Sequence, residues 1–263
     1  MSHGRPSFVT GLVLALLVLT AGTASARDDA PVVAAASDLQ FAIEEIADAF
    51  KAETGMEVRL STGSTGNFAR QIREGAPFQI FMAADEKFIA DLHRDGFTRD
   101  EGDLYALGRI VMMVPHGSPL QADGGLDTLV AALEAGRVTR FAIANPEHAP
   151  YGMRAEEALR HKGIWDALLP RIVLGENVTQ AAQFALSGNA EGGIIAYSLA
   201  LAPNIRERGT YALIPQEWHQ PLRQRMALLK NAGPVAEEFY AYMKAPAARA
   251  IMERYGFALP GAE

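Results

Sequence analysis

The fold of this chain is decided by residues 32–38, which read VVAAASD. Five small or β-branched apolar residues in a row are typical of a short buried strand. The run passes directly into Ser37 and Asp38, after which apolar residues return at helical spacing, at Phe41, Ile43, Ile46 and Phe50. A strand that leads through a polar turn into a helix is the repeating unit of an α/β protein.

The same pattern recurs along the rest of the chain. Further strands are expected at 78–84, 109–114, 141–144, 172–174 and 193–197. Helical spacing lies between them, for example at 86–92 and 155–161, and the end of the chain, 235–255, is helical with a break at Pro246. Strands that alternate with helices favour an α/β architecture with mostly parallel sheets.

The first residues are typical of a secretory signal peptide. Arg5 precedes an apolar run at 8–19, and small residues then end in Ala24-Ser25-Ala26. The apolar run is shorter than the ~20 residues that a membrane-spanning helix needs. We expect cleavage after Ala26 and an exported, soluble protein in the periplasm.

Composition excludes several classes of function. The formal net charge is −7 and no block of Lys and Arg stands out, so nucleic acid and anionic membranes are poor partners. Cysteine is absent, which excludes disulfides, thiol catalysis and thiolate metal sites. The six histidines are scattered without the spacing of a zinc site.

No low-complexity linker divides the chain, so two lobes would be joined directly, with crossings expected near Val114 and Leu213.

Four segments combine a strand end, a small or polar loop and a helix start. They are Ser37-Asp38, Ser64-Thr65-Gly66, Tyr151-Gly152 and Asn177-Val178-Thr179. Helix N-termini leave backbone N–H groups unpaired and carry partial positive charge, so they bind anions without a cationic side chain. Ligands of open α/β sheets also lie beyond the carboxyl ends of the strands. If the four segments converge, they surround a small anion with neutral donors.

Each segment also has a structural interpretation. Ser37 can be an N-cap, Ser64-Thr65-Gly66 an ordinary turn, and Tyr151 a packing residue. Val178 is a core residue by type and would contact a ligand only through its backbone N–H. His148, near the Tyr151 loop, is expected at the surface.

Taken together, these segments resemble the periplasmic molybdate-binding proteins of ABC importers. The similarity is carried by residues 34–37, 63–72, 75–86, 145–152, 177–178 and 255–257. The resemblance implies a two-lobe type II periplasmic binding protein fold with a hinged cleft between two α/β lobes. With the leader at 1–26, we expect lobe 1 at 27–114 plus 213–263 and lobe 2 at 115–212.

The resemblance also implies the roles of single residues. Ser37 and Thr65 match hydroxyl positions that hold the oxyanion, with Ser64 as the alternative to Thr65. Asp38 and Val178 match backbone N–H donors, and Tyr151 matches a contact in one branch of the family. The expected ligand is molybdate or tungstate, with no cofactor and no catalysis, and the expected partners are the permease subunits of an ABC transporter. The receptor itself is expected to be a monomer.

Asp38 departs from the family pattern, which tends to have a neutral residue there. Molybdate is fully deprotonated near pH 7 and a carboxylate facing it would repel it. We therefore expect the side chain of Asp38 to turn away and bond its own helix start. If it contacted the ligand instead, phosphate would be favoured, because phosphate keeps a proton part of the time.

Three rival functions stay open from the sequence. The same fold could bind another oxyanion such as phosphate or sulfate. A periplasmic serine hydrolase would use Ser37 or Ser64 with a histidine within hydrogen-bond reach, and no histidine is adjacent to either in sequence. A regulatory ligand sensor is disfavoured, because there is no helix-turn-helix segment and the chain carries an export signal.

Overall fold

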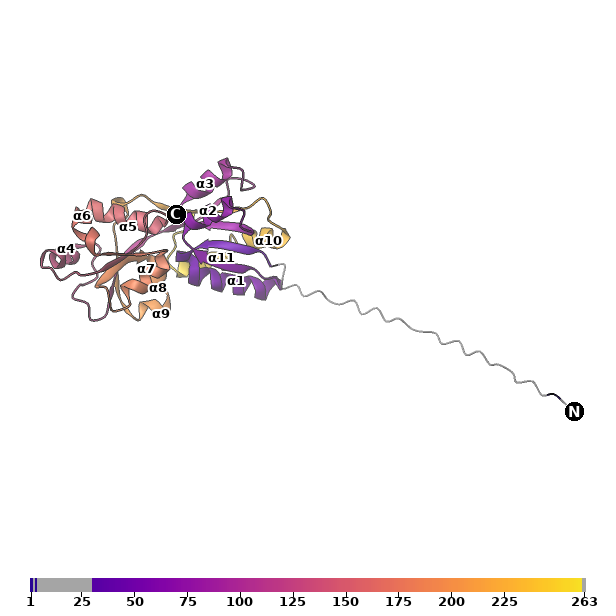
Figure 1. Ribbon diagram of the computed structural model, residues 1–263, viewed down its shortest axis with the longest axis horizontal. Helices are drawn as coiled ribbons and strands as arrows, with labels where there is room; N and C mark the ends of the chain where they lie inside the picture. The colour runs from indigo at the N-terminus through magenta and orange to yellow at the C-terminus, as the bar shows by residue number, and fades with distance from the viewer. Residues whose placement is uncertain (2, 4–29, 262–263) are drawn as a thin grey trace.

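The computed structural model describes residues 1, 3 and 30–261 of the chain. Two lobes lie side by side, each built on a five-stranded sheet with helices around it (Figure 1). Apart from Met1 and His3, the expected leader lies outside the described residues. No helix in the described ranges is long and apolar enough to cross a membrane.

The first sheet has the strand order β2-β1-β3-β10-β4. Its strands are β1 (Val32–Ala36), β2 (Arg59–Gly63), β3 (Phe78–Ala83), β4 (Asp103–Gly108) and β10 (Leu222–Leu228). The helices of this lobe are the 3-10 turn η1 (Ser37–Leu39), α1 (Gln40–Thr54), α2 (Thr65–Arg73), α3 (Glu86–Arg94), α10 (Pro234–Tyr242) and α11 (Pro246–Arg254). Strand β1 pairs in parallel with β2 and β3, whereas β10 is antiparallel to β3 and β4.

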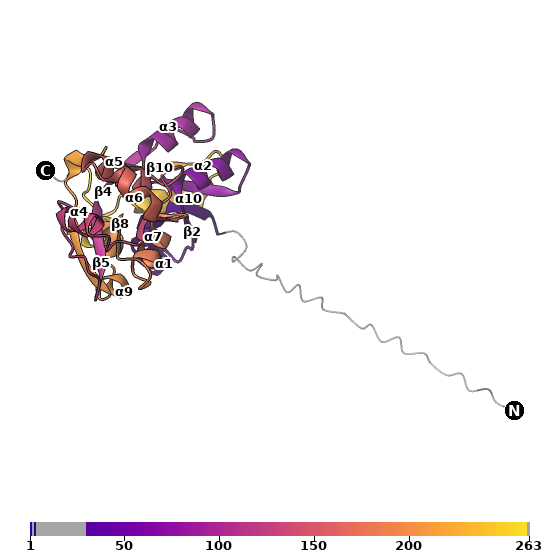
Figure 2. The same cartoon turned by 60° about the vertical axis from the view of Figure 1, so that its left-hand side comes forward.

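The second sheet has the order β7-β6-β8-β5-β9. Its strands are β5 (Ile110–Pro115), β6 (Phe141–Ala144), β7 (Ile172–Gly175), β8 (Gly192–Ala196) and β9 (Gly209–Leu213). The helices are α4 (Asp127–Glu134), α5 (Pro150–His161), α6 (Trp165–Leu168), η2 (Leu169–Arg171), α7 (Val178–Ala185), α8 (Tyr197–Leu201), α9 (Pro203–Arg206) and the turn η3 (Gln216–Trp218). In the turned view of Figure 2, α4 and α9 remain on the opposite side from α2, α3 and α10.

The α/β class and the two-lobe fold are confirmed, but each sheet is mixed, whereas we expected mostly parallel sheets. The physical reason is that the strands next to the lobe crossing arrive from the other lobe. Strand β10 is antiparallel to its neighbours in the first sheet, and β5 is antiparallel to β8 and β9 in the second.

The chain passes between the two sheets twice. Arg109 separates β4, in the first sheet, from β5, in the second. The chain returns between Leu213, the last residue of β9, and Leu222, the first of β10. Because β4 pairs with β10 and β5 with β9, the two connections run side by side and antiparallel.

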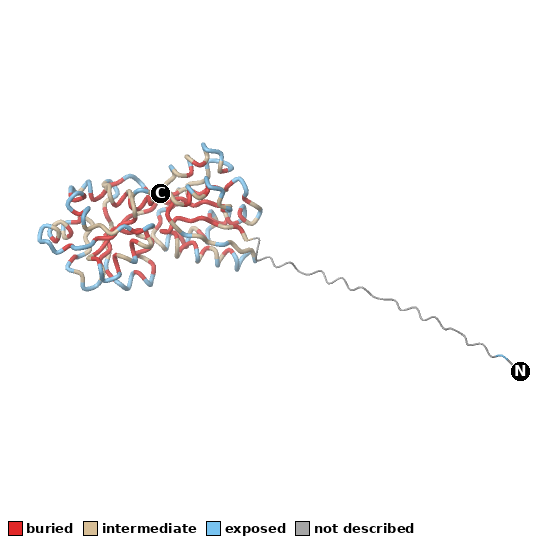
Figure 3. Tube along the Cα trace, viewed as in Figure 1, coloured by how far each residue is buried: buried red, intermediate tan, exposed pale blue. Residues whose placement is uncertain are grey.

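Alternation along the strands places apolar side chains on both faces of each sheet. In Figure 3 the buried residues, drawn in red, are concentrated in the interior of the two lobes. In β1, Val33 and Ala35 pack with Ile43 and Phe50 of α1 in one cluster. Ala34, on the other face, belongs to a second cluster with Phe68 of α2 and its neighbours. A third cluster fills the second lobe. Both sheets are therefore covered on two sides, and this fixes where their strand ends lie.

Helix α5 begins earlier than the sequence pattern indicates. It starts at Pro150, so Tyr151 and Gly152 belong to its first turn and not to a preceding loop. Proline suits this position, because its fixed φ matches the helix and its missing N–H would be unpaired there in any case. The Tyr151 side chain is therefore held by a helix turn.

Candidate functional site

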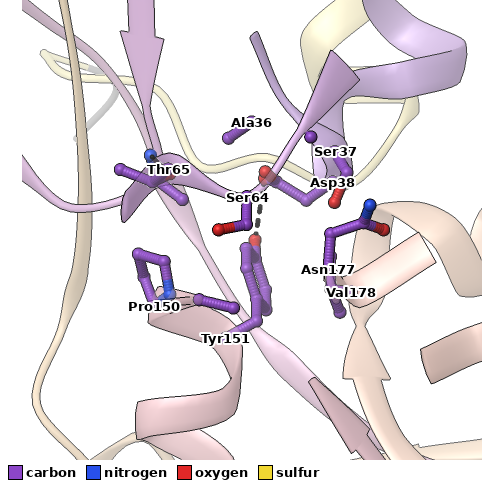
Figure 4. A pocket seen from close by; sticks show the side chains of 12 residues that line it. Ala36, Ser37, Asp38, Ser64, Thr65, Pro150, Tyr151, Asn177 and Val178 are labelled. Atoms are coloured by element: carbon purple, nitrogen blue, oxygen red, sulfur yellow. Dashed lines mark hydrogen bonds between the residues drawn. The ribbon is translucent and has the colours of Figure 1, made fainter. Parts of the chain in front are cut away.

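The carboxyl ends of four strands meet at one small cavity between the lobes. The parallel register aligns Ala36 with Gly63 at the ends of β1 and β2, and Ala144 with Gly175 at the ends of β6 and β7. Figure 4 shows the segments that follow these strands, facing one another from the two lobes. All six residues expected to bind the ligand line this cavity: Ser37, Asp38, Ser64, Thr65, Tyr151 and Val178.

The cavity is small and its lining carries no positive side chain. About 190 Å³ of space free of protein atoms lies within it, including open solvent at its mouth. The other lining residues are Ala36, Gly63, Ala84, Ala149, Pro150 and Asn177, so no Lys, Arg or His lines it. The turn η1 and the helices α2, α5 and α7 begin at lining residues. Their N-termini supply backbone N–H donors and partial positive charge.

Side-chain caps occur at two of these helix starts. Ser64 caps α2 by accepting from the N–H of Asn67 at 3.3 Å, and Asn177 caps α7 by accepting from the N–H of Gln180 at 3.0 Å. No side chain caps the turn that begins at Ser37. The structural interpretation of Ser37 as an N-cap is therefore wrong, whereas Ser64 combines a capping role with its place in the cavity lining.

Thr65 links two of the converging segments within the first lobe. Its Oγ1 accepts a hydrogen bond from the N–H of Ala84, just beyond β3, at 3.1 Å. A hydroxyl that accepts in this way still has its proton to donate. Thr65 therefore holds the start of α2 against the end of β3 and keeps a donor at the cavity.

Ser64 makes a contact across the lobes that the sequence did not indicate. Its Oγ lies 2.8 Å from Nδ1 of His148 and donates to the carbonyl oxygen of His148 at 3.0 Å. Nε2 of the same ring lies 3.5 Å from a carboxylate oxygen of Glu176. The expectation that His148 is a surface loop residue is wrong, because the closed arrangement of the lobes brings it against α2.

A buried cluster of polar side chains lies behind the cavity. Oδ2 of Asp38 accepts from the hydroxyl of Tyr151 at 3.0 Å, the contact dashed in Figure 4, and from Nε2 of Gln224 at 2.6 Å. Gln224 Nε2 also donates to the Tyr151 oxygen at 3.1 Å, and its Oε1 accepts from Tyr105 at 2.8 Å. A Cβ on Gly108 would lie 2.4 Å from the Tyr151 hydroxyl. Glycine at this position therefore leaves the cluster the room it needs.

This cluster changes what two of the expected site residues can do. A phenol has a single proton, and that of Tyr151 is directed to Asp38. The Asp38 side chain, which we expected to bond its own helix start, has its partners on α5 and β10, in segments distant along the chain. In this arrangement Tyr151 orients the carboxylate and donates no hydrogen bond into the cavity.

Burial dominates the ionisation of this cluster. It raises the pKa of Asp38 to about 6, because a buried carboxylate loses its hydration. Hydrogen bonds from Gln224, Tyr151 and the backbone of Asp38 itself offset part of that effect. Burial, together with the nearby Asp38 charge, raises the pKa of Tyr151 and Tyr105 well above the usual value, so both phenols stay protonated.

Further hydrogen bonds join the lobes around the cavity. Thr179 Oγ1 donates to the carbonyl of Ser37 at 2.9 Å, and Ser198 Oγ donates to that of Asp38 at 2.8 Å. Arg154 of α5 pairs with Asp85, which caps α3, at 2.5 Å. The Arg154 and Asp85 side chains are only 9% and 14% exposed, so water screens this ion pair weakly. The structure is therefore a closed state of the two lobes.

Gln224 is the functional residue that sequence reasoning missed most clearly, although a signal exists. Leu222, Gln224 and Met226 alternate along β10 and all three are buried. A glutamine at an inward position of such a strand marks a buried amide that needs partners.

In the described residues, no group of three or more His, Cys, Asp or Glu is placed to hold a metal ion.

Comparison with known proteins agrees with the fold. Residues 31–258 match the family described as bacterial extracellular solute-binding proteins. The molybdate-binding protein of Azotobacter vinelandii is 32% identical over 98% of this chain and 100% of its own length. That of Escherichia coli K12 is 32% identical over 93% of this chain and 95% of its own length.

Solved structures lead to the same family. The periplasmic molybdate-binding protein of Azotobacter vinelandii superposes with a TM-score of 0.80 and 31% identity, covering 88% of this chain and 99% of that one. The sulfate-binding protein of Mycobacterium tuberculosis H37Rv shares the fold at 17% identity, with a TM-score of 0.72 over 89% of this chain and 88% of that one. The chain thus belongs to the bacterial extracellular solute-binding proteins, and within them to the molybdate-binding protein family, whose members are receptors of ABC transporters and not enzymes.

Proposed function

We propose that this protein captures molybdate, and also tungstate, in the interlobe cavity and delivers it to an ABC importer. The observation that carries the proposal is a small cavity without a positive side chain, at which helix N-termini and hydroxyls converge. Such a lining offers donors to a fully deprotonated oxyanion and provides no ion pair that would slow release. The relatives named as molybdate-binding proteins support the choice of ligand.

The donors we assign come from both lobes. In the first lobe they are the hydroxyls of Ser37 and Thr65 and the backbone N–H of Asp38. The Ser64 hydroxyl is the alternative to that of Thr65, and it could donate to the ligand only by releasing the His148 carbonyl oxygen. In the second lobe the donor is the backbone N–H of Val178 at the start of α7, whose cap Asn177 leaves that N–H unused by the cap bond. Tyr151 acts from behind, through its hydrogen bond to Asp38. Capture then follows from lobe closure, which brings the two sets of donors together and excludes water.

Size is the basis we propose for selectivity. Molybdate and tungstate have longer bonds to oxygen than sulfate or phosphate, and a rigid cavity with fixed donors distinguishes ligands by those lengths. Sulfate is the alternative ligand with structural support, since a sulfate-binding protein shares the fold. Phosphate is the second alternative, because Asp38 could accept a proton from it.

The cellular setting is part of the same proposal. We propose that residues 1–26 direct export and are removed after Ala26, and that the mature protein works as a monomer in the periplasm. Its closed form would dock on the permease subunits of the transporter. Within the chain we propose two lobes, joined by the crossings at Arg109 and between Leu213 and Leu222.

A thermal-shift panel on the mature protein tests the ligand. Molybdate, tungstate, sulfate and phosphate are added separately at millimolar concentration. A ligand at a hundred times its dissociation constant adds about 2.7 kcal/mol of stability. We expect a raised melting temperature with molybdate and tungstate only. A raised melting temperature with sulfate or phosphate alone would identify that anion as the ligand instead. An unchanged melting temperature with all four anions would refute the proposed function.

A further inference from the structure

The carboxylate of Asp38 is the one feature of the cavity that an anion receptor does not need. Asp38 is 2% exposed and lines the cavity directly behind Ser37. The two side chains that donate to its carboxylate, Tyr151 and Gln224, bond the same oxygen, Oδ2. The other oxygen, Oδ1, is buried and has no hydrogen-bond partner among the described residues.

Among residues 30–261, no positive group compensates this charge. The elements around Asp38 present the phenols of Tyr105 on β4 and Tyr151 on α5, and the amide of Gln224 on β10. From α8 the hydroxyl of Ser198 bonds the Asp38 carbonyl. None of these groups is a cation, and no cation is among the causes that shift the ionisation of Asp38. A dianion in the cavity would therefore face an uncompensated carboxylate in a region with little water.

We propose that the closed site binds its oxyanion together with one proton, held between Oδ1 of Asp38 and the anion. The proposal rests on the proposed function, in which the ligand is a doubly charged oxyanion. The proton comes from solvent, so the net reaction joins receptor, dianion and one H⁺. Protonated Oδ1 becomes a donor that points to the anion, while Oδ2 goes on accepting from Tyr151 and Gln224. A group that would repel the ligand thereby becomes one of its donors.

The ionisation of the ligand-free cluster makes this exchange accessible. Burial already raises the pKa of Asp38 to about 6, and a bound dianion raises it further because like charges disfavour ionisation. At a pH between the pKa of Asp38 in the free site and its pKa in the bound site, Asp38 is ionised before the anion binds and protonated afterwards. Linkage then requires the affinity for the anion to fall about tenfold for each unit by which the pH rises. Below pH 6 the affinity levels off.

Calorimetric titration of the mature protein with molybdate tests the proposal. Heats measured at pH 7 in buffers of different ionisation enthalpy give the number of protons taken up per anion. We expect close to one for the natural protein, and a slope of about one when the logarithm of the dissociation constant is plotted against pH from 6.5 to 8. The pH series needs no variant, so it decides the proposal even if a substitution disturbs folding.

Two variants locate the proton. Asp38→Asn keeps the oxygen that accepts from Tyr151 and Gln224 and places an amide donor where Oδ1 was. We expect it to bind molybdate with no proton uptake and no pH slope. His148→Gln tests the other proton-binding side chain near the cavity, because His148 contacts Ser64. We expect this variant to keep the uptake of one proton.

The outcomes separate this inference from the proposed function. Molybdate binding without proton uptake leaves the receptor function intact and overturns the proposal that a proton binds together with the anion. Uptake that survives in Asp38→Asn, or that disappears in His148→Gln, overturns the assignment to Asp38. No binding of molybdate by the natural protein at any pH overturns the proposed function, and this inference with it.

Discussion

The backbone N–H of Gly66, in the first turn of α2, donates to the carbonyl oxygen of His148 in the other lobe at 2.9 Å. A Cβ built on Gly66 would lie 2.6 Å from that oxygen and 2.9 Å from the Cβ of His148. The backbone of Gly66 is not in the left-handed region, so its conformation does not require glycine. The lack of a side chain is needed for the approach of the two lobes.

Replacement Gly66→Ala should therefore prevent full closure without unfolding the protein. Overpacking of this kind costs about 1–3 kcal/mol, so we expect affinity for molybdate to fall by roughly 5- to 150-fold. Titration calorimetry measures the affinity and a thermal melt without ligand measures stability. The control is Gly233→Ala, where the nearest atom to a new Cβ is the Gln79 oxygen at 3.5 Å. A large fall in the ligand-free melting temperature with unchanged affinity would contradict the closure role.

The ion pair between Arg154 and Asp85 should favour the closed state. Arg154→Gln removes a charge-assisted hydrogen bond between lobes, worth about 1.5–3 kcal/mol. We expect weaker molybdate binding through faster release, measured by stopped-flow dissociation. Asp85→Asn should have a similar effect, and the double variant should be little worse than either single one. Arg160→Gln is the control on the same helix, because its pair with Glu156 stays within α5. Additive losses in the double variant would show that the pair does not act as a unit.

Ser37 and Ser64 should separate ligand binding from helix capping. Loss of the Ser37 hydroxyl removes a donor to a charged ligand, so we expect Ser37→Ala to weaken molybdate binding about 10- to 100-fold. Ser64→Ala removes a neutral hydrogen bond between the lobes, so we expect a smaller loss of affinity. Ser64→Ala should also lower the ligand-free stability by about 1 kcal/mol, because Ser64 caps α2. Ser37→Ala should leave stability nearly unchanged, because no side chain caps its turn. Urea unfolding and calorimetry distinguish the two, and equal stability losses would contradict the assignment.

The ligand-free protein should lose stability as the pH rises through 6. The pKa of Asp38 is about 6 when folded and 3.8 for an unperturbed aspartate, so the folded state binds more protons between these values. The contribution of Asp38 is thus most favourable below pH 4 and is lost as the pH rises through 6, a difference of at most about 3 kcal/mol. We expect Asp38→Asn to stabilise the protein more at pH 8 than at pH 4, as measured by urea unfolding. The same change in stability at both pH values would mean that the pKa of Asp38 is not raised in the folded protein.

The local pattern was enough to predict most of the strands and the segments of the site. Strands followed by a small polar loop and a helix mark Ser37, Ser64 and Val178, because the periodicity changes from strand to helix at these points. The parallel register of β1 with β2 and of β6 with β7 then brings those ends to one edge of each sheet. Parallel neighbours in an α/β sheet impose this geometry, so it could be anticipated.

What the sequence could not provide depends on contacts between distant segments. A single residue, Arg109, separates β4 from β5, and periodicity does not indicate that the two strands join different sheets. His148 and Gln224 belong to the site only because lobe closure and the pairing of β10 bring them to Ser64 and Asp38. The cluster around Asp38 joins four segments, and the two that contain Tyr105 and Gln224 carry no recognisable motif.

Titration of the mature protein with molybdate, in competition with sulfate and phosphate, tests the central claim most directly. Isothermal calorimetry gives the stoichiometry and the dissociation constant for each anion under one set of conditions. We expect one molybdate to bind per chain, at least about a hundredfold more tightly than sulfate or phosphate. This ratio is a difference in binding free energy of about 2.7 kcal/mol. Sulfate or phosphate bound as tightly as molybdate, or no heat of binding with molybdate, would contradict it.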